Sequence, residues 1–347
     1  MVRGSWEERL ADMQARIFAR HGRGGGRAMT RAAVAGEPPA APLPGGAAVS
    51  GHTGGDAGGP GAERVSVPLS GDTRLFAVVG DPVGQVRSPL ALTRRLAARG
   101  ENAIVAPLHV TPRDLAGALA GLALVANLGG LLVTVPHKAA AFALCAAVSG
   151  RARFVGSVNV MRKSRGGWYG DNADGRGYAE GLAAAGFAVS GCSALVLGCG
   201  GAGSAVALEL LERGASMVAL HDVDAGRRDG LAGRLAARFP GRVRVGGRDP
   251  SGFDLVANVT PMGMRTDDPL PVDVDKLEPE QFVACAITRP EVSATVVEAR
   301  RRGCRTMTGA AMFDGQADFL ADFLLSEGHE IRGQGAGAEI SSPSKQE

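Results

Sequence analysis

One short segment constrains the fold of this chain more than any other. An apolar run at 194–197 is followed at once by a glycine-rich turn with the spacing G-x-G-x-x-G, and a helical pattern begins near residue 203. In such a turn the first glycine allows a tight bend, the second leaves room for a pyrophosphate, and the third lets the helix pack on the strand. The glycines here are Gly198, Gly200, Gly201 and Gly203. The segment predicts a dinucleotide-binding unit, with the phosphates bound at the start of the helix.

The end of the next predicted strand indicates which dinucleotide is preferred. Asp222 lies 24 residues after Gly198, near the position of the acid that binds the ribose in such units. A carboxylate there accepts hydrogen bonds from the ribose hydroxyls and repels a 2′-phosphate, which favours NAD over NADP. Arg227 and Arg228 follow closely and would suit a 2′-phosphate, so NADP stays open. The plainer alternative is that Asp222 only caps the helix that follows it.

From residue 75 onward the chain alternates short apolar runs with helical patterns. The runs are apolar throughout rather than alternating, which is typical of parallel strands covered by helices on both faces, and this predicts an α/β fold. We expect strands at 75–79, 104–109, 130–135, 194–198, 216–221, 243–245, 254–258 and 282–286. We expect helices at 89–99, 111–123, 138–146, 175–185, 203–213, 225–237, 291–302 and 310–325.

Composition excludes several classes of function. The 38 basic and 35 acidic residues are too nearly balanced for a protein that binds the phosphate backbone of nucleic acid, and only 4% of residues are aromatic. Residues 115–135 are apolar and long enough to span a bilayer, but Asn127, Gly129 and Gly130 interrupt them. A helix followed by a buried strand explains this segment better. We therefore expect neither nucleic acid nor a membrane as a partner.

The cysteines and the two ends of the chain complete this description. The five cysteines show no CxxC pair and no zinc-ligand spacing, so we expect buried thiols in a cytoplasmic protein that holds no metal. Of the 43 positions at 22–64, 28 are Gly, Ala or Pro, too little apolar side chain to offset the entropy of ordering. We expect 1–72 to be a disordered extension with a short amphipathic helix, and 327–347 to be a flexible tail.

Three polar side chains follow predicted strands ahead of the nucleotide unit. They are Lys138, Asn159 and Asp174. Ligand sites in open α/β sheets lie at the carboxyl ends of strands, so these side chains would converge if their segments neighbour one another. Each also has a plainer explanation, because Lys138 can be a solvated helix start, Asn159 a turn residue and Asp174 a helix cap. The residues alone leave this alternative open.

The ordered motifs around these residues resemble the shikimate dehydrogenase family, from about residue 76 to 319. The similar segments are Gly-Asp-Pro at 80–82, Val-Arg-Ser-Pro at 86–89, Val-Thr-Val-Pro-His-Lys at 133–138, Ser-Val-Asn at 157–159, Gly-Asp-Asn-Ala-Asp-Gly at 170–175 and Asn-Val-Thr-Pro-Met-Gly-Met at 258–264. Near the C-terminus, Gly309, Met312, Gln316 and Ala317 match a helix that closes over the substrate in that family.

This resemblance implies a nicotinamide-dependent oxidation of a ring hydroxyl on a small cyclic hydroxy acid such as shikimate or quinate. Lys138 and Asp174 would form the catalytic pair, because a positioned acid or base must handle the hydroxyl proton as hydride moves. By the same resemblance the substrate would contact Ser88, Thr134, Asn159 and Gln316, and the cofactor would also contact Thr260 and Met264. No metal is implied, because the cofactor carries the redox chemistry.

The chain departs from the family pattern on one side of the expected substrate. Family positions that hold polar side chains are here Val86, Leu132, Val160, Ala173 and Thr288. Burying a carboxylate or hydroxyl against such residues without partners is unfavourable, although Ser88 at a helix start would still favour an anion. Two alternatives therefore stay open: a paralogous dehydrogenase acting on a less polar ring alcohol, and a non-catalytic regulator that binds a nucleotide or metabolite.

The resemblance also implies a division into domains. We expect a substrate-binding catalytic α/β domain at 73–174, to which helices at 309–326 return, and a Rossmann nucleotide-binding domain at 175–308. The chain would act as a monomer or a homodimer.

Overall fold

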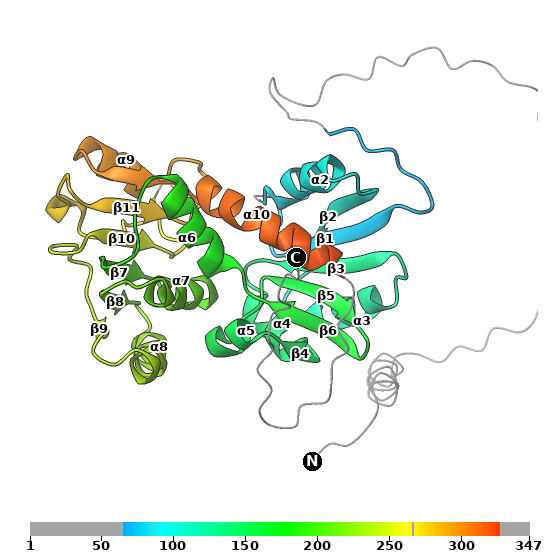
Figure 1. The fold of residues 1–347 in the computed structure, drawn as a ribbon, viewed down its shortest axis with the longest axis horizontal. Coiled ribbons are helices and arrows are strands. Elements are labelled where there is room, and N and C mark those ends of the chain that lie inside the picture. Colours follow the sequence, from blue (N-terminus) through cyan, green and yellow to red (C-terminus); the bar gives the residue numbers. More distant parts are fainter. Residues whose placement is uncertain (1–64, 85, 266, 327–347) are drawn as a thin grey trace, which may run out of the picture. The chain divides into compact units, whose positions relative to one another are not determined.

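The computed structural model describes residues 65–84, 86–265 and 267–326. Most of the extension predicted over 1–72, including its short helix, lies outside the described residues, as does the predicted tail at 327–347. Residues 65–326 contain two six-stranded sheets. Helices join and cover both sheets, so the predicted α/β fold is confirmed (Figure 1).

The first sheet has the strand order β2-β1-β3-β5-β6-β4. Its parallel part consists of β1 (Arg74–Gly80) between β2 (Ala103–His109) and β3 (Leu128–Val133). β5 (Val160–Ser164) runs antiparallel to both β3 and β6 (Gly167–Asp171), and the short β4 (Ala147–Val148) lies parallel to β6. No residue ranges were predicted for β4, β5 or β6, and because β5 is antiparallel to its neighbours the expectation of parallel strands holds for only part of this sheet.

Alternate residues of β1 face two different helix layers. Phe76 and Val78 belong to an apolar cluster with side chains of α2 (Ser88–Ala98) and α10 (Gly309–Leu325). Ala77 and Val79 belong to a second cluster, with side chains of α3 (Leu115–Ala123), α4 (Lys138–Leu144) and α5 (Gly150–Val155). Burial of both faces explains why the strand is apolar throughout.

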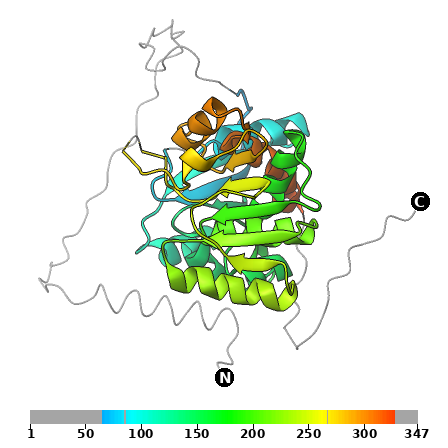
Figure 2. The ribbon, with the colours of Figure 1, turned by 90° about the vertical axis from the view of Figure 1, so that its left-hand side faces the viewer.

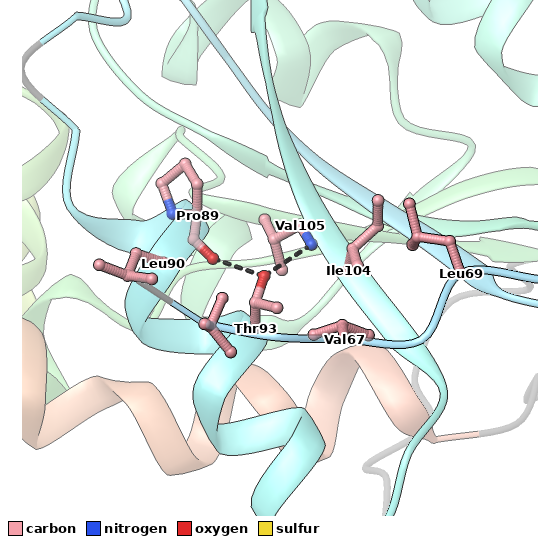
Figure 3. A pocket seen from close by; sticks show the side chains of 8 residues that line it. Val67, Leu69, Pro89, Leu90, Thr93, Ile104 and Val105 are labelled. Atoms are coloured by element: carbon pink, nitrogen blue, oxygen red, sulfur yellow. Dashed lines mark hydrogen bonds between the residues drawn. The ribbon is translucent and has the colours of Figure 1, made fainter. Parts of the chain in front are cut away.

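A side-chain hydrogen bond ties α2 to the edge strand β2. The Thr93 hydroxyl donates to the carbonyl oxygen of Pro89 at 2.6 Å and accepts from the N–H of Val105 at 3.0 Å (Figure 3). Beside it lies an apolar cavity of about 300 Å³, lined in part by Leu69, Leu90 and Ile104. The bond fixes α2, and with it Ser88 at the first position of the helix.

The second sheet has the strand order β12-β11-β10-β7-β8-β9, and every pairing in it is parallel (Figure 2). This is the doubly wound order of dinucleotide-binding folds. Its strands are β7 (Ser193–Leu197), β8 (Met217–His221), β9 (Val243–Val245), β10 (Leu255–Asn258), β11 (Phe282–Cys285) and β12 (Arg305–Met307). The five predicted strands are present here, and the three-residue β12 was not predicted. Its helical elements are α7 (Gly201–Glu212), α8 (Ala225–Arg238), the 3₁₀ turn Val274–Lys276 and α9 (Ala294–Arg301).

Glycines allow α10 to pack closely on α6 (Asp174–Ala184). A Cβ added at Gly177 would lie 2.6 Å from the Cβ of Gln316, and one added at Gly315 would lie 2.5 Å from the carbonyl oxygen of Gly177. Such distances are too short for any larger residue. After β12, α10 therefore returns along α6 to the first sheet, as predicted for the C-terminal helices, and it contacts α2 and β5 there.

The apolar segment at 115–135 forms α3, a turn and β3, which confirms the helix-and-strand interpretation. The helix begins four residues later than predicted, and the strand lies two residues earlier. Among the described residues, no helix is long and apolar enough to cross a membrane.

Candidate active site

Lys138 and Asp174 meet at one edge of the first sheet. Lys138 begins α4 just after β3, and Asp174 begins α6 just after β6. β5, which runs antiparallel between those strands, starts at the same edge, so Asn159 directly before it lies there too. The Lys138 ammonium donates to Asp174 Oδ2 at 2.5 Å. The side chains are 18% and 4% exposed, so the ion pair is largely shielded from water while the lysine retains access.

Asn159 connects this pair to α10. Its amide nitrogen donates to Asp174 Oδ1 at 2.8 Å and to Gln316 Oε1 at 3.1 Å, and its oxygen accepts from the N–H of Ala173 at 2.9 Å. Asn159 and Gln316 are both buried. The structure thus brings together Lys138, Asp174, Asn159 and Gln316, four of the six residues predicted to act on the substrate.

Two further residues of the network were not assigned a role from the sequence. The Asn172 side chain donates to Ser157 Oγ at 3.0 Å and accepts from the N–H of Asp174 at 3.0 Å. Both residues are buried. They hold the start of α6 against the turn before β5 and thereby fix where the Asp174 carboxylate points. Both residues lie inside family motifs, Ser157 at 157–159 and Asn172 at 170–175, and this is the sequence signal that could have identified them.

The glycine-rich turn lies between β7 and α7, as predicted. Gly198 has φ +98°, which larger residues rarely adopt, and a Cβ at Gly203 would lie 1.9 Å from the carbonyl oxygen of Gly198. A Cβ at Gly200, by contrast, would meet no atom of the described residues within 4 Å. This open space in front of the α7 N-terminus fits the phosphates of a dinucleotide.

The same turn adjoins the lysine–aspartate pair. A Cβ added at Gly201 would lie 2.8 Å from Ser157 Oγ and 3.9 Å from Lys138 Cβ. The predicted cofactor turn and the predicted catalytic lysine are therefore neighbours, although 63 residues separate Gly201 from Lys138 in the sequence. This adjacency is what a hydride transfer beside a proton transfer requires.

Asp222 lies at the end of β8 and braces the turn. Its Oδ2 accepts from the N–H of Cys199 at 2.7 Å, and its Oδ1 accepts from the N–H of Asp224 at 2.9 Å. Nη1 of Arg227 lies 3.6 Å from the same carboxylate. Burial raises the pKa of the Cys199 thiol to about 12, so this thiol stays neutral beside the expected phosphates. Asp222 thus holds the glycine-rich turn at the end of β8, with an arginine beside it.

Thr260 flanks the first glycine, whereas Met264 lies further out. A Cβ at Gly198 would come within 3.0 Å of Thr260 Cγ2, and the Thr260 hydroxyl donates to Asn258 Oδ1 at 2.7 Å. Met264 is 42% exposed in the turn that follows. The structure brings Thr260 to the glycine-rich turn and leaves the Met264 side chain partly exposed to solvent.

The two remaining predicted substrate residues are Ser88 and Thr134. Ser88 is buried at the start of α2, and Thr134 is half-buried after β3. The departures Leu132, Val160 and Ala173 belong to the apolar cluster beneath α2 and α10, and Val86 packs against it. Thr288 is half-buried; an ion pair of Arg87 with Glu291 at 2.7 Å joins its loop to the start of α2.

Within the described ranges, no group of three or more His, Cys, Asp or Glu side chains is placed to hold a metal ion. All five cysteines are free, and four of them are buried as expected, while Cys145 is partly exposed.

Comparison with known proteins extends this description. A family model described as the shikimate dehydrogenase substrate binding domain matches residues 78–161. A relative named shikimate dehydrogenase (NADP(+)), from Rubrobacter xylanophilus, is 37% identical over 256 residues, which cover 72% of this chain and 89% of the relative.

Solved structures show the same architecture. Shikimate 5-dehydrogenase from Thermus thermophilus in complex with NADP(H) and shikimate is 28% identical, with a TM-score of 0.65 and coverage of 73% of this chain and 93% of that one. Quinate dehydrogenase from Corynebacterium glutamicum in complex with NAD is 27% identical, with a TM-score of 0.64 and coverage of 73% and 94%.

Proposed function

The chain belongs to the shikimate dehydrogenase family, and from this premise we propose that it oxidises and reduces a small cyclic hydroxy acid, shikimate or quinate, at a ring hydroxyl. It is a nicotinamide-dependent oxidoreductase of the shikimate dehydrogenase type. The observation that carries the proposed reaction is the proximity of the cofactor turn to the lysine–aspartate pair, through Gly201, Ser157 and Lys138.

Lys138 is the proposed acid and base. The nicotinamide, when bound, supplies the hydride chemistry. Lys138 Nζ, as the neutral amine, takes the hydroxyl proton when the alcohol is oxidised, and the resulting ammonium returns that proton when the ketone is reduced. Asp174 holds the ammonium group and accepts a hydrogen bond from the substrate hydroxyl. Asn159 and Gln316 bind neighbouring ring hydroxyls, and the hydrogen bond from Asn159 keeps Oδ1 of Asp174 in position.

For the cofactor, we propose NAD rather than NADP. The Asp222 carboxylate lies where the ribose of the adenosine half is expected, and a 2′-phosphate would meet its negative charge. Arg227 offers the opposing interaction, because its guanidinium lies 3.6 Å from that carboxylate. Gly198, Gly200, Gly201 and Gly203 would hold the phosphates, and Thr260 and Met264 would also contact the cofactor.

The apolar residues at positions where the family has polar ones favour a second candidate, a ring alcohol without a carboxylate. Leu132, Val160 and Ala173 are at most 5% exposed, and none of them can donate a hydrogen bond from its side chain. A substrate carboxylate would then depend on Ser88, Thr134 and the N–H groups at the start of α2. The single observation for this candidate is that three of the five departures, Leu132, Val160 and Ala173, belong to one apolar cluster, against which Val86 packs.

The domain assignment is part of the proposal. Residues 73–174 with 309–326 would bind the substrate, and residues 175–308 would bind the nucleotide. A monomer or homodimer in the cytoplasm stays a prediction.

Initial rates test the proposal directly. The purified chain is assayed with shikimate and with quinate, each with NAD and with NADP, by the absorbance of the reduced nicotinamide. Turnover of either acid, faster with NAD, is the expected result. Cofactor binding without turnover of either acid contradicts the hydroxy-acid substrate, and turnover of cyclohexane diols in the same assay then favours the second candidate.

A further inference from the structure

A second group of cations lies at the opposite end of the first sheet from Lys138. There β3 begins and β5 ends, whereas the catalytic residues follow the far end of β3 and precede β5. A cavity of about 450 Å³ opens at this end. Its lining combines three cations with apolar side chains and one amide: Arg74, Arg162, Lys163, Leu128, Leu324, Ala126 and Asn127, together with Gly129 and Ser326.

Arg162 is the unusual residue of this cavity. It is 5% exposed, and its Nε and Nη1 atoms are buried without any hydrogen-bond partner. Among the described residues, no carboxylate forms an ion pair with Arg162 or Lys163, and Arg74 has only Glu101 at 3.9 Å. Buried charges in proteins are normally paired, so an arginine of this kind calls for a counter-charge.

Two aromatic rings contact Arg162 but leave its N–H groups unsatisfied. The guanidinium carbon lies 5.1 Å from the centre of the Tyr169 ring and 5.5 Å from that of Phe323. Cation–π contacts use the charge of the flat guanidinium group, whereas its N–H bonds lie in the plane and need acceptors there. Burial lowers the pKa of Arg162 and of Lys163, as expected for cations that lack a counter-ion.

We propose that this cavity binds a carboxylate, which accepts hydrogen bonds from Arg162 and pairs with Arg74 and Lys163. A planar carboxylate matches the fork of the guanidinium group. Leu128 and Leu324 lie on the same lining and would contact an apolar part of the ligand. The cavity shares no residue with the Lys138 network, so this proposal does not rest on the proposed reaction.

The carboxylate has two possible sources. One is a small carboxylic acid from solution, which a cavity of this volume accommodates. The other is the chain itself, since Ser326 lines the cavity and Glu327 and Glu330 follow it in the sequence. Both sources present the same chemistry to Arg162.

Calorimetric titration of the full chain with benzoate separates these sources, with benzamide as the uncharged control of the same shape. The variants are Arg162→Met, which keeps an apolar stem, and Arg74→Gln, at a half-exposed site that tolerates the change. Arg113→Gln is the matched control, because the Arg113 side chain is 91% exposed and does not line the cavity. The double variant Glu327→Gln/Glu330→Gln removes the chain's own carboxylates.

We expect the wild type to bind benzoate and not benzamide, with affinity at least tenfold weaker in Arg162→Met, several-fold weaker in Arg74→Gln and unchanged in Arg113→Gln. If only the double glutamate variant binds benzoate, the chain supplies the carboxylate itself, and the site is still supported. Two results overturn the proposal. One is that neither the wild type nor the double glutamate variant binds benzoate, and the other is that the wild type and Arg74→Gln bind benzoate with equal affinity. The second criterion holds even if Arg162→Met fails to fold.

Discussion

Two regions of the substrate site differ in polarity although they alternate along the chain. The polar region consists of Lys138, Asp174, Asn159 and Gln316, and the apolar region consists of Val86, Leu132, Val160 and Ala173. Asn159 precedes Val160 and Ala173 precedes Asp174, so one step along the backbone separates a hydrogen-bonding residue from a core residue. We therefore expect that substrate choice in this chain can be changed without loss of the catalytic residues, because the two are assigned to adjacent but separate side chains.

The strongest way to break this comparison is Lys138→Ala. We expect kcat to fall about 10³-fold, since a positioned acid–base group contributes on that order, while the dissociation constant of NAD changes little. Steady-state rates and a cofactor titration measure the two quantities. Lys276→Ala is the matched control, at a lysine whose side chain is 52% exposed and paired with Asp249. Normal turnover in Lys138→Ala would remove the lysine from the mechanism.

Asn159→Ala tests whether the polar region acts as a network. The change removes the partner of Asp174 Oδ1, of Gln316 and of the Ala173 N–H. We expect a loss of about 2–4 kcal/mol in the free energy of unfolding, because buried groups lose their hydrogen bonds, and a fall in kcat of about 10²-fold. Asn102→Ala, at an exposed asparagine, is the control.

Urea unfolding and steady-state rates give both values for Asn159→Ala. Unfolding unchanged from the wild type would show that the network does not stabilise the fold. A kcat unchanged from the wild type would show that Asp174 does not need Asn159 to stay in position.

Asp222→Asn changes the proposed cofactor site and leaves the polar and apolar regions of the substrate site intact. The amide oxygen still accepts from the Cys199 N–H, but the negative charge and the acceptor for the Asp224 N–H are lost. We expect the ratio of kcat/KM for NAD over NADP to fall roughly tenfold, about 1.4 kcal/mol, with the preference between shikimate and quinate unchanged. If the cofactor ratio stays constant, Asp222 braces the turn and has no part in cofactor choice.

Val86→Ser tests the apolar region with the smallest expected effect. The serine would return a hydroxyl beside Ser88 at the start of α2, where a carboxylate has few donors. We expect KM for shikimate to fall about threefold to tenfold, the value of one hydrogen bond, at constant kcat. Val297→Ser on α9, where the valine is 50% exposed, is the control. A KM that does not change would mean that the carboxylate binds away from this position.

The second sheet was predictable from the sequence, and the first only in part. Strands such as β7 and β10 are buried on both faces, so their apolar runs are short and distinct. β5 and β6 contain Arg162, Lys163 and two glycines. These residues interrupt the apolar runs from which the other strands were predicted. Gly166 and Gly167 both have positive φ, and a Gly-Gly pair between two short segments is a hairpin signal that was available in the sequence.

The parts of the site that lie in family motifs were predictable, and the parts that depend on packing between distant elements were not. The convergence of Lys138, Asn159 and Asp174 follows from three strand ends at one edge, which the motif order indicated. The proximity of Gly201 to Ser157 depends on how α7 packs against the turn before β5, and the spacing of these residues in the sequence does not predict it. The burial of Leu132 and Val160 in one cluster likewise required the register of β3 and β5, in which they are opposite each other.

A crystal structure with NAD and shikimate bound tests the central claim most directly, namely that one ligand meets both regions at once. We predict the reacting hydroxyl within about 3 Å of both Lys138 Nζ and an Asp174 oxygen, the hydrogen-bond distance that proton transfer requires. The ring should lie beside Leu132, with the carboxylate at Ser88. A hydroxyl beyond reach of Lys138, or a carboxylate bound away from the start of α2, would contradict the account.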